Sequence, residues 1–135
     1  MGKYTTLQND IFSIFASTTW KAENIKTYPT DLVAVNPGSE FIRVNIVAGD
    51  DGINLASVSG VLIIDIYVSA GMGPGRANLI ADRLDVYLVG KSFKLTPPGT
   101  TQFQNSTMSF SGRDYDNESL SRYTYSIPFN YFGVL

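Results

Sequence analysis

Residues 61–68 form an apolar run in which the only polar residues, at 65 and 67, share one face of a period of two, and the period of the apolar residues changes to 3.6 after residue 75. The first run is rich in β-branched residues and predicts a strand with one fully apolar face, while Asp65 and Tyr67 lie on the other face. A turn with three glycines follows. Beyond it a helix is predicted over about residues 75–89, with Gly90 placed to end it. The apolar stripe of this helix contains Ala77, Ile80, Ala81, Leu84 and Leu88.

A second helical pattern lies near the N-terminus, where apolar residues recur every three or four positions. Thr5 and Gln8 have the spacing of a capping box, so a helix is predicted over about residues 6–17 with Thr5 as its N-cap. Asp10 is expected on the polar side of this helix. Trp20 follows the helix and is interpreted as a core anchor at its exit.

Residues 41–47 also alternate and predict a strand with Arg43 on its polar face. Asp50 and Asp51 follow in a glycine-flanked turn, residues 49–52, and this strand is expected to form a long-tipped hairpin with the next one. A calcium loop would need further oxygen ligands at regular steps and a closing glutamate, which do not follow here. A solvated turn is therefore the favoured interpretation of the two aspartates.

The C-terminal third contains two further extended stretches. Residues 103–110 have strand composition without a clearly apolar face, and residues 120–132 predict a final strand whose aromatic and aliphatic residues share one face. Pro128 within this strand indicates an edge position or a bulge, because proline cannot donate to the ladder. A polar turn with Arg113 and Asp114 joins the two stretches, and its acidic residues are interpreted as solvated rather than as a cation site.

Two helices combined with runs of strands indicate one α+β domain over residues 1–135. We expect a mainly antiparallel sheet, with the N-terminal helix and the second helix, at about residues 75–89, packed on one of its faces. Residues 25–28 add a short extended piece before the first long strand. Neither an internal repeat nor a low-complexity segment interrupts this pattern.

Composition narrows the function more than the fold. The chain contains neither cysteine nor histidine, which removes disulfides, thiolate and serine–histidine nucleophile systems and the usual zinc sites. The formal charge is −2 and the positive residues are scattered, so direct nucleic-acid readout is not expected. No apolar run approaches the length of a membrane span. Charged residues make up only 16%, against about 25% on average, so we expect other subunits to cover part of the surface.

The glycine turn at residues 69–75 invites comparison with a phosphate-binding loop, because helix N-termini bind anions. Its glycines are spaced GxGxG rather than GxGxxG, Pro74 removes one N–H group, and the chain has no GK[ST] motif. A tight connection between strand and helix is the favoured interpretation. Asp65 is the only carboxylate inside an apolar strand, and one such group is thin support for acid–base catalysis. We therefore predict a protein that is not an enzyme and needs no cofactor or metal.

As a whole, the pattern resembles the tail terminator, or tail-completion, proteins of long-tailed bacteriophages. The resemblance covers roughly residues 4–132. It rests on four segments in order: the amphipathic N-terminal helix, the strand FIRVNIVAG at 41–49, the segment GVLIIDIYVSAGMGPG at 60–75 with the helix after it, and the closing RYTYSIPFNY at 122–131. Residues 91–111 depart from the family pattern, and their role stays open.

This resemblance implies a small α+β subunit that is assembled in the host cytoplasm into a homo-hexameric ring and resides in the virion, at the head-proximal end of the tail. Such a ring caps the tail tube, ends its polymerisation and provides the surface that meets the head–neck connector proteins. The implied partners are further copies of the chain, the tail tube protein and those connector proteins. A head–tail connector or another neck ring protein is the alternative, since both classes are small ring-formers.

The resemblance also directs attention to contacts with other subunits. Arg43, Asp65 and Tyr67 lie on the second faces of their strands, where we expect them to meet a neighbouring subunit or to face the lumen. An ordinary cross-strand pair between Arg43 and Asp65 is the other interpretation. The end of the hairpin, around residues 50–58, and the loop at residues 112–119 are candidate contacts with the tube or the neck. The full set of candidate contact residues is Arg43, Asp50, Asp51, Asp65, Tyr67, Arg113 and Asp114.

Overall fold

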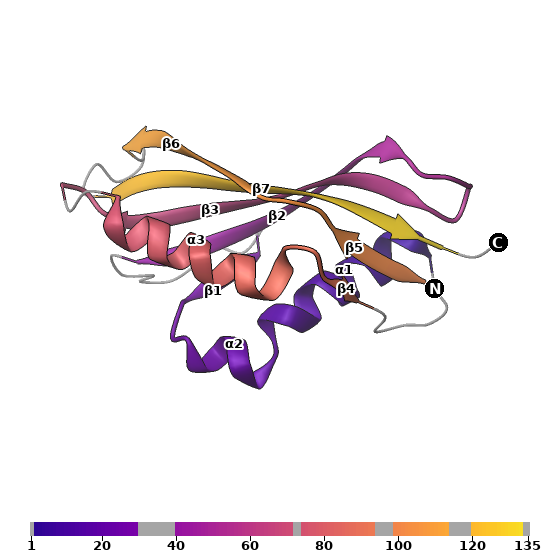
Figure 1. Ribbon diagram of the computed structural model, residues 1–135, viewed down its shortest axis with the longest axis horizontal. Coiled ribbons are helices and arrows are strands. Elements are labelled where there is room, and N and C mark those ends of the chain that lie inside the picture. The colour runs from indigo at the N-terminus through magenta and orange to yellow at the C-terminus, as the bar shows by residue number, and fades with distance from the viewer. Residues whose placement is uncertain (1, 30–39, 72–73, 94–98, 114–119, 134–135) are drawn as a thin grey trace.

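The computed structural model has a curved, half-barrel-like sheet with helices against one of its faces (Figure 1). It describes residues 2–29, 40–71, 74–93, 99–113 and 120–133. The described elements are α1 (Lys3–Phe15), α2 (Thr18–Ala22), β1 (Thr27–Pro29), β2 (Phe41–Asp51), β3 (Val58–Ser69), α3 (Gly75–Leu88), β4 (Ser92–Phe93), β5 (Thr100–Phe103), β6 (Thr107–Arg113) and β7 (Leu120–Phe132). This arrangement confirms the predicted α+β class.

Three long antiparallel strands, β2, β3 and β7, form the centre of the sheet. The full strand order is β1-β2-β3-β7-β5-β4, and β6 pairs with the part of β7 that β5 leaves uncovered. The short β1 runs parallel to β2. The sheet is therefore mainly antiparallel, as predicted, with one parallel pair at its edge.

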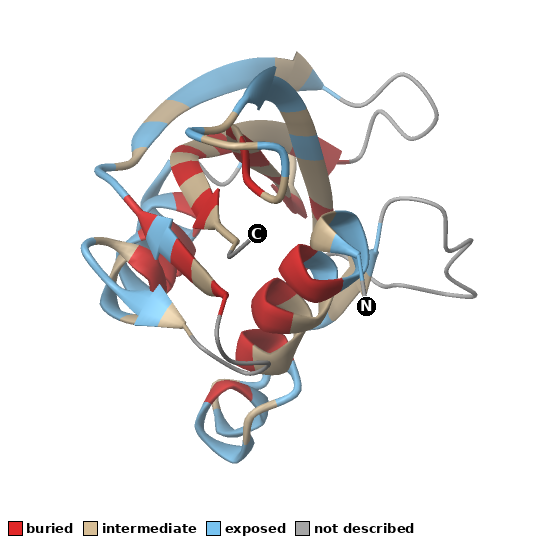
Figure 2. Ribbon diagram, turned by 90° about the vertical axis from the view of Figure 1, so that its right-hand side faces the viewer, coloured by how far each residue is buried: buried red, intermediate tan, exposed pale blue. Residues whose placement is uncertain are grey.

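The core lies between the concave face of the sheet and the helices α1 and α3. Figure 2 shows buried residues on the helices and in bands that alternate with less buried residues along the strands. Alternation in β3 explains the pattern, because its even-numbered positions face the helices and are buried while most of the odd ones are half-buried. The largest fully buried side chains are Trp20, Tyr125, Phe129, Leu7, Ile11, Ile42, Leu62, Ile64, Ile66, Ile80, Leu84 and Leu88.

Helix α3 confirms its sequence prediction within one residue. All five residues of the predicted apolar stripe are buried. The chain leaves the helix through Gly90, whose φ of 69° lies in the left-handed region that glycine adopts without steric cost. Pro74 is the N-cap residue, one position before the first helical turn.

The predicted start of α1 is wrong. The helix begins at Lys3 with Gly2 as its N-cap, and no side chain caps it. The capping-box assignment of Thr5 and Gln8 therefore fails. The chain becomes helical earlier, and the Thr6 hydroxyl donates a 3.0 Å hydrogen bond to the Gly2 carbonyl inside the first turn. The capping-box spacing correctly indicated a helix in this region, but it did not determine the first residue of the helix.

The predicted exposure of Asp10 is also wrong. Its side chain is fully buried, and its Oδ2 accepts a 2.8 Å hydrogen bond from the buried Thr101 hydroxyl of β5. Asp10 lies three residues after Leu7 and four before Ile14, so helical geometry places all three on the same face. The charge of Asp10 led us to expect a solvent-exposed side chain, but its position on the apolar face of the helix places it in the interior. A buried carboxylate persists because a partner from a distant strand satisfies it.

Trp20 confirms its role as a core anchor, although the helix that carries it, α2, was not predicted. The indole is 1% exposed and donates a 2.9 Å hydrogen bond from Nε1 to the Thr27 hydroxyl. Its ring meets Phe15 and Tyr87 edge-on, with centroids 5.3 and 5.2 Å away. The Ser17 hydroxyl caps α2 by accepting from the Trp20 N–H.

Strand β2 continues beyond its predicted end. The ladder with β3 passes a bulge between Val47 and Asp50 and ends at the Asp51–Val58 pair. The predicted turn at 49–52 is therefore wrong in position, and the chain reverses over residues 52–57. Gly60 lies opposite the bulge, where a Cβ atom would collide with the Val47 carbonyl. This close backbone approach explains how β2 accommodates its extra residue.

The predicted strand at 103–110 is two strands, because β5 ends at Phe103 and β6 begins at Thr107. Pro128 of β7 also differs from its prediction, since β7 is flanked on both sides and is not an edge strand. β5 pairs with residues 129–132 of β7 and β6 with residues 121–126. Pro128 therefore lies beside the connection between β5 and β6, where the ladder is interrupted and no N–H donor is needed.

Candidate functional site

The β2–β3 hairpin projects past α3 at one end of the molecule, and its turn is held in a defined conformation (Figure 1). We call residues 52–57 the hairpin tip. The Asn54 Oδ1 accepts from the Ala56 N–H at 2.8 Å and from the Ser57 hydroxyl at 3.0 Å. The Ser57 hydroxyl also accepts from the N–H of Gly133 at 2.9 Å, and Lys3 donates to the Leu55 carbonyl at 3.3 Å. Both chain ends of the described fold therefore fix the tip.

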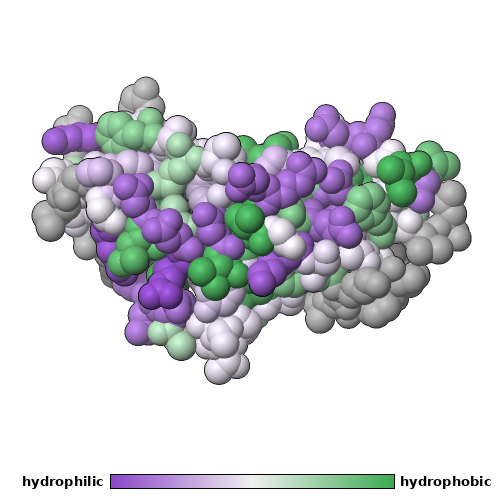
Figure 3. Space-filling model, viewed as in Figure 1, coloured by the Kyte–Doolittle hydropathy of each residue, from purple (hydrophilic) through white to green (hydrophobic). Residues whose placement is uncertain are grey.

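This ordered tip presents two large apolar side chains to solvent. Ile53 is 77% exposed and Leu55 is 86% exposed, the highest values among the large hydrophobic residues that the structure describes. Figure 3 shows hydrophobic residues gathered at this end of the molecule. Asp50 and Asp51 are exposed on the last positions of β2, directly before the tip. An ordered apolar pair with an acidic border is typical of a protein contact.

The sequence analysis identified the two aspartates but missed the apolar pair. It treated residues 53–59 as a polar stretch of small residues because it gave one asparagine and two serines more weight than the apolar residues between them. The sequence did contain a signal for this pair. Ile53 and Leu55 lie two positions apart among turn-forming residues, and side chains in a turn at the end of a hairpin do not reach the core.

The structure brings Arg43 and Asp65 together on the convex face of the sheet, directly opposite each other on β2 and β3. The ion pair of Asp65 is nevertheless made with Arg122 of β7, whose Nε lies 3.9 Å from the Asp65 Oδ1. The Thr124 hydroxyl donates to the same oxygen at 3.4 Å. The Arg43 guanidinium carbon lies 5.8 Å from the centroid of the Tyr67 ring, within cation–π range.

The Nε of Arg43 is buried without a hydrogen-bond partner among the described residues. A buried guanidinium donor normally finds an acceptor. The described residues of one chain thus supply no hydrogen-bond acceptor for the Arg43 Nε on the convex face.

Tyr67 lies beneath the surface rather than on it. Its side chain is 5% exposed and stacks on Phe41, with ring centroids 4.5 Å apart. Together with Leu120 and the partly buried Tyr28 it forms a small second hydrophobic cluster on the convex face. In this chain Tyr67 therefore supports the surface around Arg43 and offers little area of its own to a partner.

The remaining sequence-predicted residues lie apart from the hairpin. Arg113 is exposed at the end of β6, in register with Ser121 near the start of β7. At the hairpin end of the sheet, β3 begins at Val58, and Val58 pairs with Tyr131 near the other end of β7. Ten residues of extended strand, about 33 Å, separate these two places. Asp114 and the rest of the polar turn at 114–119 lie outside the described residues.

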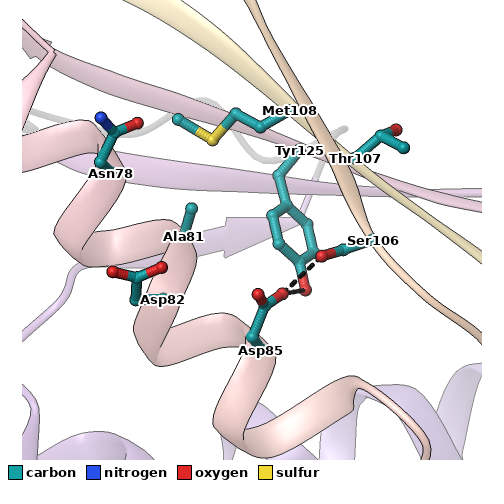
Figure 4. A pocket seen from close by; sticks show the side chains of 8 residues that line it. All are labelled: Asn78, Ala81, Asp82, Asp85, Ser106, Thr107, Met108 and Tyr125. Carbon is teal, nitrogen blue, oxygen red and sulfur yellow. Dashed lines mark hydrogen bonds between the residues drawn. The ribbon is translucent and has the colours of Figure 1, made fainter.

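A hollow of about 210 Å³ lies between α3 and β6 (Figure 4). The Tyr125 hydroxyl and the Ser106 hydroxyl both donate to the Asp85 Oδ1, each at 2.6 Å. Burial, assisted by the hydrogen bond to Asp85, raises the pKa of Tyr125 above its usual value. The phenol therefore stays protonated as a donor, and the trio ties α3 to β7 and to the connection between β5 and β6. It does not constitute a nucleophile with a base.

The described residues contain no cluster of acidic side chains that could hold a metal ion. They also contain no helix long and apolar enough to cross a membrane. At the glycine turn, β3 ends at Ser69 and α3 begins at Gly75, a spacing that agrees with a short strand-to-helix connection. Arg76, in the first turn of α3, makes a bidentate ion pair with Glu40 at 2.6 and 2.7 Å.

Comparison with known proteins supplies a fold and no function. No protein family matches the sequence, and no curated protein matches it. A solved structure whose name states no function superposes with a TM-score of 0.61 at 12% sequence identity. The match covers 98% of this chain and 94% of the other. At such low identity the similarity shows that the two chains share a fold over nearly their whole lengths, and nothing beyond that.

Proposed function

We propose that this chain is a tail terminator: a structural virion subunit that forms a ring on the head-proximal end of a phage tail tube and ends its polymerisation. The observation that carries the proposal is the ordered hairpin tip with Ile53 and Leu55 exposed by 77% and 86%. Two such side chains would each contribute roughly 1.5–3 kcal/mol if a partner buried them. Their rigid support lowers the entropic cost of that burial.

The mechanism is binding alone. A ring of identical subunits matches the last ring of tube subunits and covers the surface on which the tube would otherwise grow. Head-to-tail contacts that close by rotation require two different patches on every subunit. The low charge content of the chain, 16%, agrees with a surface of which a large part is covered in the assembly. The opposite face of the ring would meet the head–neck connector proteins.

The test measures mass in solution by light scattering, first on the protein alone and then with the cognate tail tubes. We expect either a mass near six subunits that caps tube ends, or a monomer that assembles only on them. Electron microscopy of tubes with gold-labelled protein would locate it at one end. Protein that ignores tubes overturns the proposal, and binding to filled heads in place of tubes would assign it to the head–neck connector class.

A further inference from the structure

Among the described residues, one long edge of the sheet has no strand beside it. β6 pairs with β7 on one side, and Figure 1 shows it as the outermost strand at the upper border of the sheet. The other edges are short or interrupted. β1 has three residues and ends in Pro29, β4 has two residues, and the edge of β2 beyond β1 carries a bulge and two aspartates. A free edge without such protection is a place where another strand can add.

The hydrogen-bonding direction of β6 follows from that of β7. The Pro128 carbonyl accepts a 3.0 Å hydrogen bond on the side of β7 where β5 and β6 lie, so the even-numbered residues of β7 direct their backbone groups to that side. Thr107 and Ser109 lie opposite two of these residues. The backbone N–H and C=O groups of Met108 and Phe110 therefore point away from β7, toward the open edge.

The open part of β6 lacks the features that normally keep free edges apart. Residues 107–111 read TMSFS, without charge or proline, and the bulge of this strand comes only after Phe110. The Phe110 side chain is 62% exposed, and its ring centroid lies 4.9 Å from that of Tyr123, which supports it. A supported, exposed aromatic ring on an uncharged edge indicates a binding site for another strand.

The pattern of this segment is symmetric about Ser109. Read in either direction, it alternates polar, apolar, polar, apolar, polar. When two copies pair antiparallel with Ser109 opposite Ser109, Met108 of each copy lies opposite the partner's Phe110. Every outward N–H and C=O group of these residues then has a partner, and apolar side chains meet apolar side chains. No like charges face each other across the contact.

The partner's Phe110 also finds room beside α3. Met108 is in register with the buried Tyr125, so its side chain lies on the helix-covered face, where it lines the hollow between α3 and β6 (Figure 4). A side chain opposite Met108 in a paired strand shares that face. The hollow has a volume of about 210 Å³, and a cavity of about 150 Å³ is large enough for a benzene ring.

We infer that two copies of this chain bind through their β6 strands, antiparallel about a two-fold axis at Ser109, with the Phe110 ring of each copy against the hollow of the other. The occupant of the free edge is thus a second copy. The inference does not rest on the proposed function, because β6 pairs with residues 121–126 of β7 and the hairpin tip lies at the other end of that strand. It gives the free protein a self-association site separate from the tip.

The first experiment removes the exposed ring. Phe110→Ser should raise the dimer dissociation constant by at least about a hundredfold, because two rings are lost per dimer and each corresponds to tenfold or more. Val86→Ser is the matched control, since Val86 is 63% exposed on α3. Sedimentation velocity over a concentration series compares them, and circular dichroism checks that each variant is folded. A variant that dimerises as tightly as the native chain overturns the inference, and so does a native chain that is still monomeric at about 1 mM.

The second experiment follows the backbone by hydrogen exchange. In the monomer the amides of Met108 and Phe110 point outward and should exchange fast, whereas the amide of Ser109 is directed at β7 and should be protected. In the dimer the two outward amides should slow by at least about tenfold, while Ser109 changes little. NMR spectra at low and high protein concentration measure all three. Dimerisation without new protection at positions 108 and 110 would rule out strand pairing.

The third experiment places a cysteine on the two-fold axis and uses the absence of native cysteine. Opposite residues in a non-hydrogen-bonded pair have Cα atoms about 4.5 Å apart, which is within disulfide range. Ser109→Cys should therefore form a disulfide-linked dimer under mild oxidation. Ser111→Cys is the matched control, because this exposed residue lies opposite the partner's Thr107 and not opposite itself. Preferential cross-linking through position 111 would refute the inferred register.

The same variants separate this inference from the proposed function. A chain that dimerises and cross-links through position 109 but ignores tail tubes would refute the terminator function and keep the strand pairing. Tube capping by a chain that neither dimerises nor cross-links would refute the pairing and keep the function. Protein that shows neither behaviour overturns both.

Discussion

The substitution Gly60→Ala tests whether the bulge in β2 determines the stability of the central sheet. A methyl group at position 60 would collide with the Val47 carbonyl and lie 2.9 Å from the Ala48 Cα. Both are backbone atoms, so no side-chain rotation relieves the overlap and β2 must move away from β3. That movement strains the ladder that leads to the hairpin. Overpacking of a tight site costs about 1–3 kcal/mol and occasionally more, and we expect about 3 kcal/mol because backbone must move.

The expected shift in melting temperature follows from the chain length. An unfolding entropy of about 2.1 cal/mol/K per residue gives roughly 280 cal/mol/K for 135 residues, so 3 kcal/mol lowers the Tm by about 10 °C. Fluorescence of Trp20, the single tryptophan, reports unfolding in a thermal or urea series. Gly75→Ala is the matched control, because a Cβ there meets nothing within 4 Å and alanine suits a helix start. A loss below about 3 °C for Gly60→Ala would refute the reasoning.

Three further predictions concern buried polar groups. Because burial raises the pKa of folded Tyr125, the unfolded chain loses this proton first, so the folded state should lose about 1.4 kcal/mol per pH unit above pH 10. Tyr125→Phe should remove that slope in urea titrations and cost about 1 kcal/mol at neutral pH, where Asp85 loses a donor; an unchanged alkaline slope would contradict this. Asp10→Ala should cost about 1–3 kcal/mol in the same assay, because the Thr101 hydroxyl stays buried without this acceptor; a cost under 0.5 kcal/mol would show that the contact is dispensable. Trp20→Phe, followed by circular dichroism, should cost about 2 kcal/mol through the lost indole hydrogen bond and packing; an unchanged melting temperature would contradict that role.

The amino-acid sequence alone determined the class of the fold and the faces of its main elements. The buried residues of α3 follow its 3.6-residue period, and those of β3 and β7 follow the period of two. These predictions succeeded because a long segment with one apolar face can bury it in only one way. The glycine after α3 was found for a local reason as well, since left-handed φ at position 90 is a property of that residue.

The tertiary structure decided which distant groups meet. Asp10 is buried because Thr101 of β5 satisfies it, and Pro128 is tolerated inside the sheet because β5 and β6 share one side of β7. Asp65 stands opposite Arg43, as its strand position allowed, yet its ion pair is made with Arg122. No local pattern carries such pairings. Asp10 and Thr101, like Asp65 and Arg122, lie more than fifty positions apart in the sequence, and Pro128 depends on the placement of two separate strands.

The same division holds for the candidate contact surface. The two aspartates before the hairpin tip were visible in the sequence as a polar turn signal. The exposure of Leu55 was not, because it follows from a turn that Asn54, Ser57, Gly133 and Lys3 hold together from three parts of the chain. A hydrophobic residue can serve as a contact for a partner only when the fold holds it on the surface, away from the hydrophobic core. That placement is a property of the assembled sheet and helix, and the local sequence cannot specify it.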